Sequence, residues 1–425
     1  MEKNWSLETI CLQGGYEPED GQARVLPIVQ STTYKYSDPD FVADLFDLAA
    51  EGHMYSRISN PTVDAFEKKM AQLEGGVGAV ATSSGQSATT LAMLNICKQG
   101  DHILSASTIY GGTHTLFAST FKKMGIEVTF ADPSLELEEL VKLAKPNTKV
   151  VFGEIIGNPG LNILDFEKFS KLAKEIGVPF AVDNTLATPY LCRPIEHGAN
   201  IIIHSATKYT DGHATSLGGV VIDAGNFDWK ENGFSDFVDP DPTYHGISYV
   251  ETFGESAYIV KLRVQLLRDL GTCLSPFNAF LMHKGLETLH LRMERHSDNA
   301  LRLAQFLESH ECVSWASYPG LQSHSSNEAS KKYLPKGCSG ILTFGIKGGI
   351  EESKTFMRNL KLAAIVVHLG DARTSVLHPA STTHRQLSEQ DQIKCGVTPD
   401  LIRVSVGIEG IDDIIADFDN ALKSI

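Results

Sequence analysis

The sequence predicts an α/β protein: a mostly parallel sheet covered by helices, followed by a smaller α+β domain. Between about residues 62 and 222, short apolar runs rich in β-branched residues alternate with amphipathic stretches of helix length. The apolar runs lack polar residues at alternate positions, which is typical of strands buried on both faces of a parallel sheet. At 425 residues the chain is about two to three times as long as an ordinary domain, so more than one core is expected.

The elements are predicted as follows. Residues 1–59 lack sustained periodicity and are interrupted by prolines, so we expect an arm that packs on a neighbouring subunit. The large domain spans 60–262, with strands at 77–84, 102–107, 126–131, 149–155, 179–183 and 200–206. Its helices are expected at 86–98, 111–124, 136–144 and 165–176. A long loop (225–245) and helical sequence (about 255–310) follow, and the C-terminal domain, 263–425, adds short strands at 340–347 and 401–409.

Composition excludes several classes of protein. The net charge of −15 argues against a nucleic-acid or membrane-surface partner, since both require clustered positive charge. The longest apolar runs, such as 363–367, are far too short to span a bilayer, and no signal peptide is visible, so we expect a cytoplasmic protein. The seven cysteines stand singly, without C-x-x-C spacing, and His378 and His384 do not fit a helical ligand pair. Neither a disulfide framework nor a metal site is expected.

Three groups stand where predicted strands end, the edge at which open α/β sheets bind ligands. Ser83–Ser87 lies between the first strand and a helix, where free N–H groups can bind phosphate. Asp183 ends one buried strand and Lys208 follows the next, where burial would lower the pKa of its amine. Taken singly, these could be a helix cap, a loop aspartate and a surface lysine. Together they supply the anchor, the ring-nitrogen partner and the imine that pyridoxal phosphate (PLP) requires.

These residues belong to a series of motifs that resembles the Cys/Met-metabolism enzymes, which are fold-type I PLP proteins. The resemblance implies the fold of these PLP-dependent transferases, with a mostly parallel sheet of seven-stranded type in the large domain and a smaller α+β C-terminal domain. The matching stretches cover nearly the whole chain and are SSGQSA (83–88), IYGGTHTLF (109–117), EIIGNP (154–159), AVDNT (181–185), SATKY (205–209), HPASTTH (378–384) and LIRVSVGIE (401–409). The branch of sulfhydrylases that act on O-acetylhomoserine is suggested by SSGQSA, DPDPTYHG (239–246) and the segments 262–281 and 285–296.

The resemblance implies a role for each matching residue. Lys208 matches the lysine that binds the cofactor covalently, Asp183 the partner of the ring nitrogen, and Tyr110 the aromatic residue stacked on the ring. The remaining cofactor contacts are Asn158, near the phenolic oxygen; Ser84, Gly85, Gln86, Ser205 and Thr207, at the phosphate; and Tyr55 and Arg57, at the phosphate of the neighbouring subunit. Arg403 matches the residue that binds the substrate carboxylate, and His368 lies nearby. An oligomer with shared sites, by the family's habit a tetramer, is implied.

The implied reaction replaces the acetoxy group of O-acetyl-L-homoserine with sulfide or methanethiol, giving homocysteine or methionine and acetate. Lys208 would carry the protons, with Tyr110 or the neighbouring Tyr55 assisting at the γ-carbon. Relatives that share the cofactor stay open as alternatives: methionine γ-lyase, cystathionine γ-synthase, and the O-succinylhomoserine and O-acetylserine sulfhydrylases. Two departures bear on this choice. Gly112 stands where methionine γ-lyases carry a cysteine, and His368 where relatives have serine or asparagine.

A nicotinamide-dependent oxidoreductase is the alternative from another class. The segment Gly76–Ala81 matches the G-x-G-x-x-A dinucleotide fingerprint. In a dinucleotide-binding unit, however, the glycines follow a strand and open a helix, whereas here they precede the predicted strand. A non-catalytic homologue is the other alternative, and the presence of every expected cofactor ligand argues against it.

Overall fold

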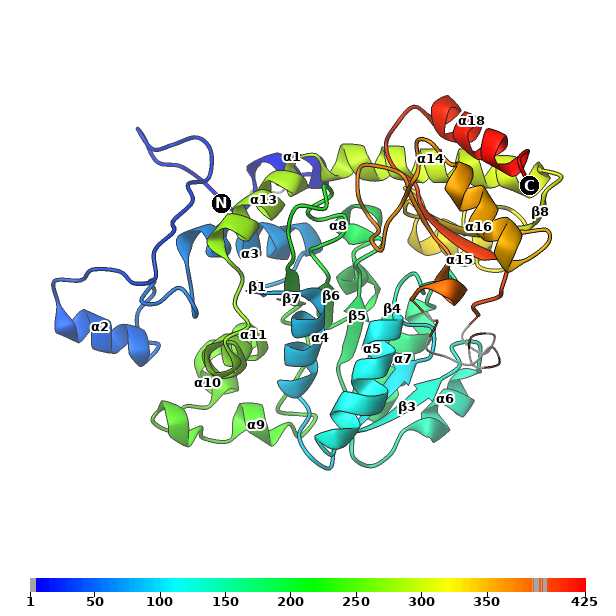
Figure 1. Cartoon of the computed structure of the whole chain (residues 1–425). Coiled ribbons are helices and arrows are strands. Elements are labelled where there is room, and N and C mark those ends of the chain that lie inside the picture. Colours follow the sequence, from blue (N-terminus) through cyan, green and yellow to red (C-terminus); the bar gives the residue numbers. More distant parts are fainter. Residues whose placement is uncertain (1–4, 384, 386–389, 391, 393–395) are drawn as a thin grey trace.

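The larger of two sheets is central to the computed structural model, which describes residues 5–383, 385, 390, 392 and 396–425 (Figure 1). Its strand order is β1-β7-β6-β5-β4-β2-β3. The bounds are β1 (Gly78–Thr82), β2 (His102–Ala106), β3 (Glu127–Ala131), β4 (Thr148–Glu154), β5 (Phe180–Asp183), β6 (Ile201–His204) and β7 (Gly219–Asp223). Only β7 is antiparallel to its neighbours. The predicted mostly parallel sheet of seven-stranded type is confirmed, and β7 is the strand that was not among the six located from the sequence.

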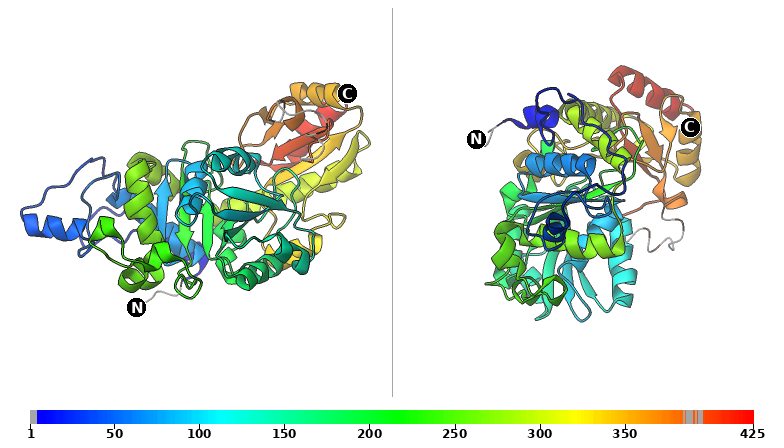
Figure 2. Two further views of the ribbon diagram at one scale, coloured as in Figure 1. Left: turned by 90° about the horizontal axis from the view of Figure 1, so that it is seen from below. Right: turned by 90° about the vertical axis from the view of Figure 1, so that its left-hand side faces the viewer.

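Helices lie on both sides of this sheet (Figure 2). They are α3 (Pro61–Glu74), α4 (Gly85–Leu94), α5 (Gly111–Thr115), the π-helix η1 (Leu116–Phe121), α6 (Leu137–Leu143), α7 (Phe166–Ile176), α8 (Thr188–Leu191) and the 3-10 helix η2 (Pro194–His197). Local chemistry sets their ends. The side chain of Asn60 accepts hydrogen bonds from the first turn of α3, and Gly75, at a φ of 83°, ends the helix in the left-handed region.

The smaller sheet lies in the C-terminal part of the chain, with the order β10-β11-β12-β9-β8. Its strands are β8 (Val313–Ser317), β9 (Ile341–Ile346), β10 (Ala364–Ile365), β11 (Ser375–Leu377) and β12 (Leu401–Ser405). The helices of this part are α13 (Pro276–Glu287), α14 (Leu289–Ser309), α15 (Asn327–Tyr333), α16 (Ile350–Asn359), the 3-10 helix η6 (Pro379–Ser381) and α18 (Ile411–Leu422). The helix α14 packs against α8 of the large domain as well as β8, β9 and α18. The N-terminal arm and the smaller sheet lie at opposite ends of the molecule (Figure 2).

Two segments are more ordered than the sequence analysis expected. The arm contains the helices α1 (Leu7–Gln13) and α2 (Pro39–Phe46). The expected loop 225–245 contains α9 (Ser235–Val238) and the 3-10 helix η3 (Pro242–Tyr244). Its Trp229 ring stacks on Phe237, with centroids 4.1 Å apart, and on Tyr258, at 5.5 Å. These aromatic rings supply the apolar contacts that the polar composition of the segment conceals.

Helical sequence between the two sheets is broken into short pieces. They are α10 (Tyr249–Phe253), the 3-10 helix η4 (Gly254–Ser256), α11 (Ala257–Lys261), the π-helix η5 (Leu262–Leu267) and α12 (Arg268–Leu270). Gly271, at a φ of 70°, ends this series. In the Gly76–Ala81 segment, Gly76 precedes β1 and Gly78 is its first residue. The glycines therefore do not follow a strand and open a helix, so this segment lacks the geometry of a dinucleotide loop.

Candidate active site

Two carboxyl groups lie side by side where adjacent strands end. Glu154 is the last residue of β4 and Asp183 the last of β5, and the parallel register pairs them directly. Paired residues of neighbouring strands point to the same face, so both side chains share one environment. They are 5% and 9% exposed. Burial raises the pKa of Asp183, while hydrogen bonds from Thr185 and the nearby His204 oppose that shift.

Lys208 lies in the turn after β6. The strand β5 separates β6 from β4, which ends at Glu154. Its main-chain N–H donates to the Ser205 carbonyl at 3.1 Å, and its own carbonyl accepts from Gly212 at 2.8 Å. Within the described residues, its amine has no hydrogen-bond or ion-pair partner. Burial, helped by the charge of Arg403, lowers the pKa of Lys208 to about 8. A substantial fraction of the amine is therefore neutral and nucleophilic near physiological pH.

Small residues lie together at the N-terminus of α4, close to the turn that carries this lysine. Ser84 caps the helix by accepting a hydrogen bond from the Ser87 N–H at 3.1 Å. Gly85 approaches the end of β6 so closely that a Cβ there would lie 2.5 Å from the Cβ of Ser205. Only glycine permits this approach, which brings free helix N–H groups and the Ser205 hydroxyl together. The arrangement suits a phosphate group.

The remaining two residues expected at the phosphate differ in their availability. Gln86 follows Gly85 in the first turn of α4, and its amide lies beside Gly112, where a Cβ would come within 2.8 Å of it. The Thr207 hydroxyl, in contrast, donates to the Gly218 carbonyl and accepts from the Gly218 N–H, both at 3.1 Å. A phosphate contact from Thr207 would therefore require exchanging one of these bonds.

Tyr110 stands at the start of α5, and its side chain is 49% exposed. Its main-chain N–H donates to Glu154 Oε2 at 2.6 Å. A Cβ added at Gly112 would lie 2.4 Å from the Tyr110 ring, so the ring occupies the space that a side chain there would need. Glu154 is not among the site residues predicted from the sequence, although it stands at the end of a buried strand, the same signal that identified Asp183.

The smaller sheet contributes Arg403, which lies next to His368. Arg403 lies within β12, and its guanidinium donates to the His368 carbonyl at 3.4 Å. It has no carboxylate partner among the described residues, and burial lowers its pKa. The Nε2 atom of His368 is buried and unpartnered in the described part of the chain. Burial and the neighbouring Lys208 charge lower the pKa of His368, so its ring is neutral.

Main-chain packing joins the lysine to the smaller sheet. A Cβ at Gly370 would lie 2.9 Å from the Tyr209 nitrogen and 3.1 Å from the Lys208 carbonyl carbon. Gly370 in turn donates its N–H to the Ser405 hydroxyl at 2.9 Å. The buried Tyr209 hydroxyl accepts a hydrogen bond from the Gly340 N–H at 3.1 Å. Residues in or next to β9 and β12 thus hold the Lys208–Tyr209 segment in place.

The structure does not bring every expected residue to Lys208. Tyr55 and Arg57 lie in the N-terminal arm, where the guanidinium is 5.3 Å from the centre of the Tyr55 ring and donates to the Arg268 carbonyl. Asn158 lies in the turn after β4, beside a cis Asn158–Pro159 bond. His378 donates or accepts at both ring nitrogens, with Ser381 and the Pro399 carbonyl, and so has a structural role. His384 and Cys395 lie outside the described residues.

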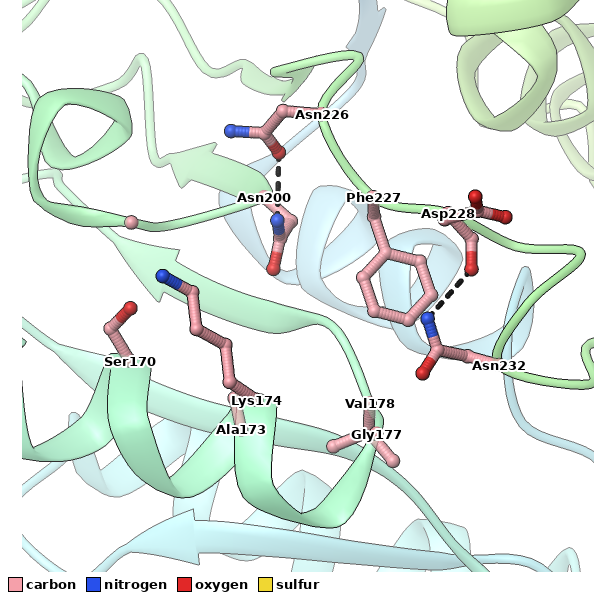
Figure 3. Close-up of a pocket in the computed structure, with 11 residues that line it drawn as sticks. Ser170, Ala173, Lys174, Gly177, Val178, Asn200, Asn226, Phe227, Asp228 and Asn232 are labelled. Atoms are coloured by element: carbon pink, nitrogen blue, oxygen red, sulfur yellow. Dashed lines mark hydrogen bonds between the residues drawn. The ribbon is translucent and has the colours of Figure 1, made fainter.

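A separate hollow of about 200 Å³ lies near the start of β6, at the end of that strand opposite to Lys208 (Figure 3). Lys174, Asn200, Phe227 and Asp228 are among the residues that line it. Asn200 directly precedes β6, whereas Lys208 follows that strand, so the hollow is separate from the candidate active site. In the described ranges, no three His, Cys, Asp or Glu side chains gather as metal ligands. Nor does any helix there have the length and apolar character needed to cross a membrane.

Comparison with known proteins places this geometry in a family. The sequence profile of the Cys/Met metabolism PLP-dependent enzymes matches residues 8–423. The chain belongs to that family. It is therefore a PLP-dependent enzyme, as the motifs predicted, and the alternative of a nicotinamide-dependent oxidoreductase is set aside.

Relatives of this PLP-dependent enzyme match over nearly their full lengths. The O-acetyl-L-homoserine sulfhydrylase of Leptospira meyeri is 48% identical, covering 100% of this chain and 98% of its own. The homocysteine synthase of Schizosaccharomyces pombe is 50% identical, covering 98% of both. A crystal structure of a Campylobacter jejuni protein named as an O-acetylhomoserine (thiol)-lyase superposes with a TM-score of 0.95 and is 38% identical, covering 99% of this chain and 100% of that one. It carries a pyridoxyl-lysine monophosphate.

The groups present here fit the cofactor of this family. Lys208 offers a primary amine of lowered pKa, Asp183 a buried carboxyl and Gly85 an opening next to helix N–H groups. These are the functions needed to bond an aldehyde, hold a cationic ring nitrogen and bind a phosphate.

Proposed function

We propose that this enzyme replaces the acetoxy group of O-acetyl-L-homoserine with sulfide, or with methanethiol, forming L-homocysteine or methionine and acetate. The names of the relatives support this choice of substrate. The structural observation that carries it is the packing that joins Lys208 to the strand of Arg403: Gly370 lies against the main chain of Lys208 and donates its N–H to Ser405, two residues after Arg403 on β12. A base thus faces a carboxylate-binding group, as an α-amino acid substrate requires.

Each residue of the site then has a definite role. PLP, when bound, withdraws electrons from the substrate and so acidifies its α- and β-protons. Asp183 holds the ring-nitrogen charge, and Ser84, Gly85, Gln86, Ser205 and Thr207 bind the phosphate with Tyr55 and Arg57 of a second subunit. Tyr110 covers the ring, and Asn158 contacts its phenolic oxygen. These assignments combine the motif matches with the positions described above.

Proton transfer falls to Lys208, which removes the α-proton and then moves a β-proton so that acetate can leave from the γ-carbon. Tyr110, or Tyr55 from the second subunit, assists at that carbon. Arg403 binds the α-carboxylate through its planar guanidinium. The neutral His368, with its buried and unpartnered Nε2, donates or accepts a hydrogen bond on the same side of the substrate.

A methionine γ-lyase reaction is the second candidate on this scaffold. Gly112 favours the sulfhydrylase, because the lyases carry a cysteine at this position. We further propose that the enzyme is a cytoplasmic homotetramer built from dimers. Apolar side chains on the arm support this assembly: Val25 is 52% exposed and Phe46 59% exposed.

Product analysis of the PLP-loaded enzyme tests the proposed reaction. We expect homocysteine from O-acetylhomoserine only when sulfide is added, and no turnover by K208A, which lacks the base. Mainly 2-oxobutanoate and ammonia, with or without sulfide, would establish a lyase instead. Appreciable sulfhydrylation by K208A would contradict the role of Lys208.

A further inference from the structure

The pair of buried carboxyls at the ends of β4 and β5 is more than the cofactor requires. One carboxylate suffices to hold a protonated ring nitrogen, and Asp183 is the residue that the motif match assigns to it. Glu154 lies beside it in register, and neither side chain forms an ion pair with Lys, Arg or His among the described residues. Two neighbouring carboxylates in one buried place repel each other, so the pair favours holding one proton.

Hydrogen bonding decides which of the two acids holds that proton. Asp183 accepts from the Thr185 N–H at 2.9 Å and from the Thr185 side chain, and both bonds stabilise its charged form. Glu154 accepts one main-chain bond, from Tyr110. Burial and the charge of Asp183 raise the pKa of Glu154 well above its usual range. The hydrogen bonds therefore favour the proton on Glu154 and the charge on Asp183.

The hydrogen bond from the Tyr110 N–H gives Glu154 a second role. The ring of Tyr110 is half exposed, and no side chain caps the short helix α5 that begins beside it. The contact between Glu154 Oε2 and the Tyr110 N–H, at 2.6 Å, therefore anchors the segment from which the ring projects.

We propose that Glu154 is a positioning residue that acts as a neutral acid, anchoring the main chain of Tyr110 and leaving Asp183 as the single negative charge at the cofactor ring. This inference rests on the proposed function only in taking Asp183 and Tyr110 as the cofactor's neighbours. Glutamine is the conservative replacement, because its amide oxygen can accept the same hydrogen bond without charge. Alanine removes the acceptor and leaves the Tyr110 N–H unpaired.

The variants E154Q and E154A separate this role from simple support of the fold. The readouts are the dissociation constant of PLP and the circular-dichroism band of the bound cofactor, which reports how the ring is held. We expect E154Q to match the unsubstituted enzyme within about twofold in affinity, and E154A to bind PLP about tenfold more weakly, the effect of losing one buried hydrogen bond. The band of E154A should also lose most of its amplitude.

A matched control is D223N, which alters another buried carboxyl of the same sheet. Asp223 ends β7 and pairs with Ile201, the first residue of β6, so it lies at the opposite end of that strand from Lys208. Burial raises the pKa of Asp223 to about 7. We expect D223N to change thermal unfolding without changing the cofactor band. An E154A band and affinity equal to those of the unsubstituted enzyme would overturn the proposal. Equal damage in E154Q and E154A would also overturn it, because it would show that an ionised carboxylate is needed.

The outcomes stay distinct from those of the proposed reaction. If the loaded enzyme forms no homocysteine while E154Q and E154A still differ in the cofactor band, the reaction is misassigned and the positioning role stands. If homocysteine forms and the two variants do not differ, the reaction stands and the positioning role is wrong.

Discussion

Individual residues of the site are held in protonation states that suit the proposed chemistry. The pKa of the Lys208 amine is lowered by burial and by Arg403, and that of the His368 ring by burial and by Lys208. The pKa of the Glu154 carboxyl is raised by burial and by Asp183. The site thus combines an amine that is partly neutral near physiological pH, a neutral imidazole and a neutral acid around one carboxylate. Each state has a neighbour as part of its cause, so the three are coupled.

Competitive labelling with trace acetic anhydride would test the amine in the cofactor-free protein. Because the pKa of Lys208 is lowered to about 8, its reactivity should rise from about pH 6.5 and level off above about pH 9.5 (a range of about 1.5 units on either side). Lys98 provides the control, since its hydrogen bond to Asp236 raises its pKa and its labelling should still rise there. Mass spectrometry of the two peptides measures both. Parallel curves would contradict the lowered pKa.

The sequence revealed those site residues that carry their own local signal. Lys208 and Asp183 follow apolar strands, and a charged arginine inside the strand LIRVS needs an anionic partner, so all three could be predicted. Glu154 carries the same local signal as Asp183, but its pairing with Asp183 could not be predicted, because that pairing comes from the register between β4 and β5. That pairing joins residues from separate strands, and one sequence does not show which strands are neighbours.

At the scale of elements, two π-helices interrupt the helical stretches near the site. The π-helix η1 directly follows the short helix that begins after Tyr110, and η5 carries Arg263. The guanidinium of Arg263 donates to Glu67 Oε2 at 2.6 Å and to the carbonyls of Ile58 and Ala79, both at 2.9 Å. One side chain therefore joins the arm, α3 and β1. We interpret the π-turn as the feature that directs Arg263 inward.

Replacing this arginine should destabilise the protein through the carboxyl that it leaves behind. Glu67 is 3% exposed, and R263M would leave it buried without a cation. We expect a loss of about 3 kcal/mol, or a fall of about 3 °C in melting temperature for a chain of this size. R302M removes an exposed ion pair and should cost less than about 1 kcal/mol.

The same variant should depend on pH. Burial already raises the pKa of Glu67 in the folded protein, and losing Arg263 raises it further. A carboxyl whose folded pKa exceeds its unfolded pKa favours folding at low pH, and that contribution is lost as pH rises through the folded pKa. The deficit of R263M should therefore be smaller at pH 5 than at pH 8, and R263M/E67Q should recover part of the stability at pH 8. A deficit independent of pH would contradict this explanation.

The elements themselves were predictable to different degrees. Six strands of the larger sheet could be located because each is a continuous apolar run between helices. The antiparallel direction of β7 could not, because its sequence, GVVID, is as apolar as that of a parallel strand. The helices within 225–245 were hidden for another reason: the contacts of Trp229 with Phe237 and Tyr258 join residues of separate segments.

At the scale of the whole molecule, the N-terminal arm extends away from the end that carries the smaller sheet (Figure 2). Arg57 and Tyr55 lie on this arm and make no contact with Lys208 within the chain, although the motif match assigns them to a phosphate site. A second subunit would reconcile the two facts. The sequence could predict such an arm from its lack of a core of its own, but not the contacts that it makes.

Subunit mixing tests this arrangement. K208A and R57A should each be nearly inactive alone, whereas subunits of the two variants that reassort at random should recover about a quarter of the unsubstituted activity. A mixed dimer would contain one site with both defects and one with neither. K208A mixed with D183N is the control: these residues belong to the same site of one chain, so no activity should return. Equal recovery in both mixtures would contradict shared sites.

The packing of Lys208 against Gly370 has a consequence for the size of substrate that the enzyme accepts. Gly370 is bonded to Ser405, and Ser405 lies two residues after Arg403 on the same strand. The main chains that carry the amine and the guanidinium are therefore linked through Gly370, even though their residues are 195 positions apart (403 − 208) in the chain. A movement of the smaller sheet against the larger one that breaks these contacts would change the span between the amine and the guanidinium, and with it the length of amino acid that fits between them.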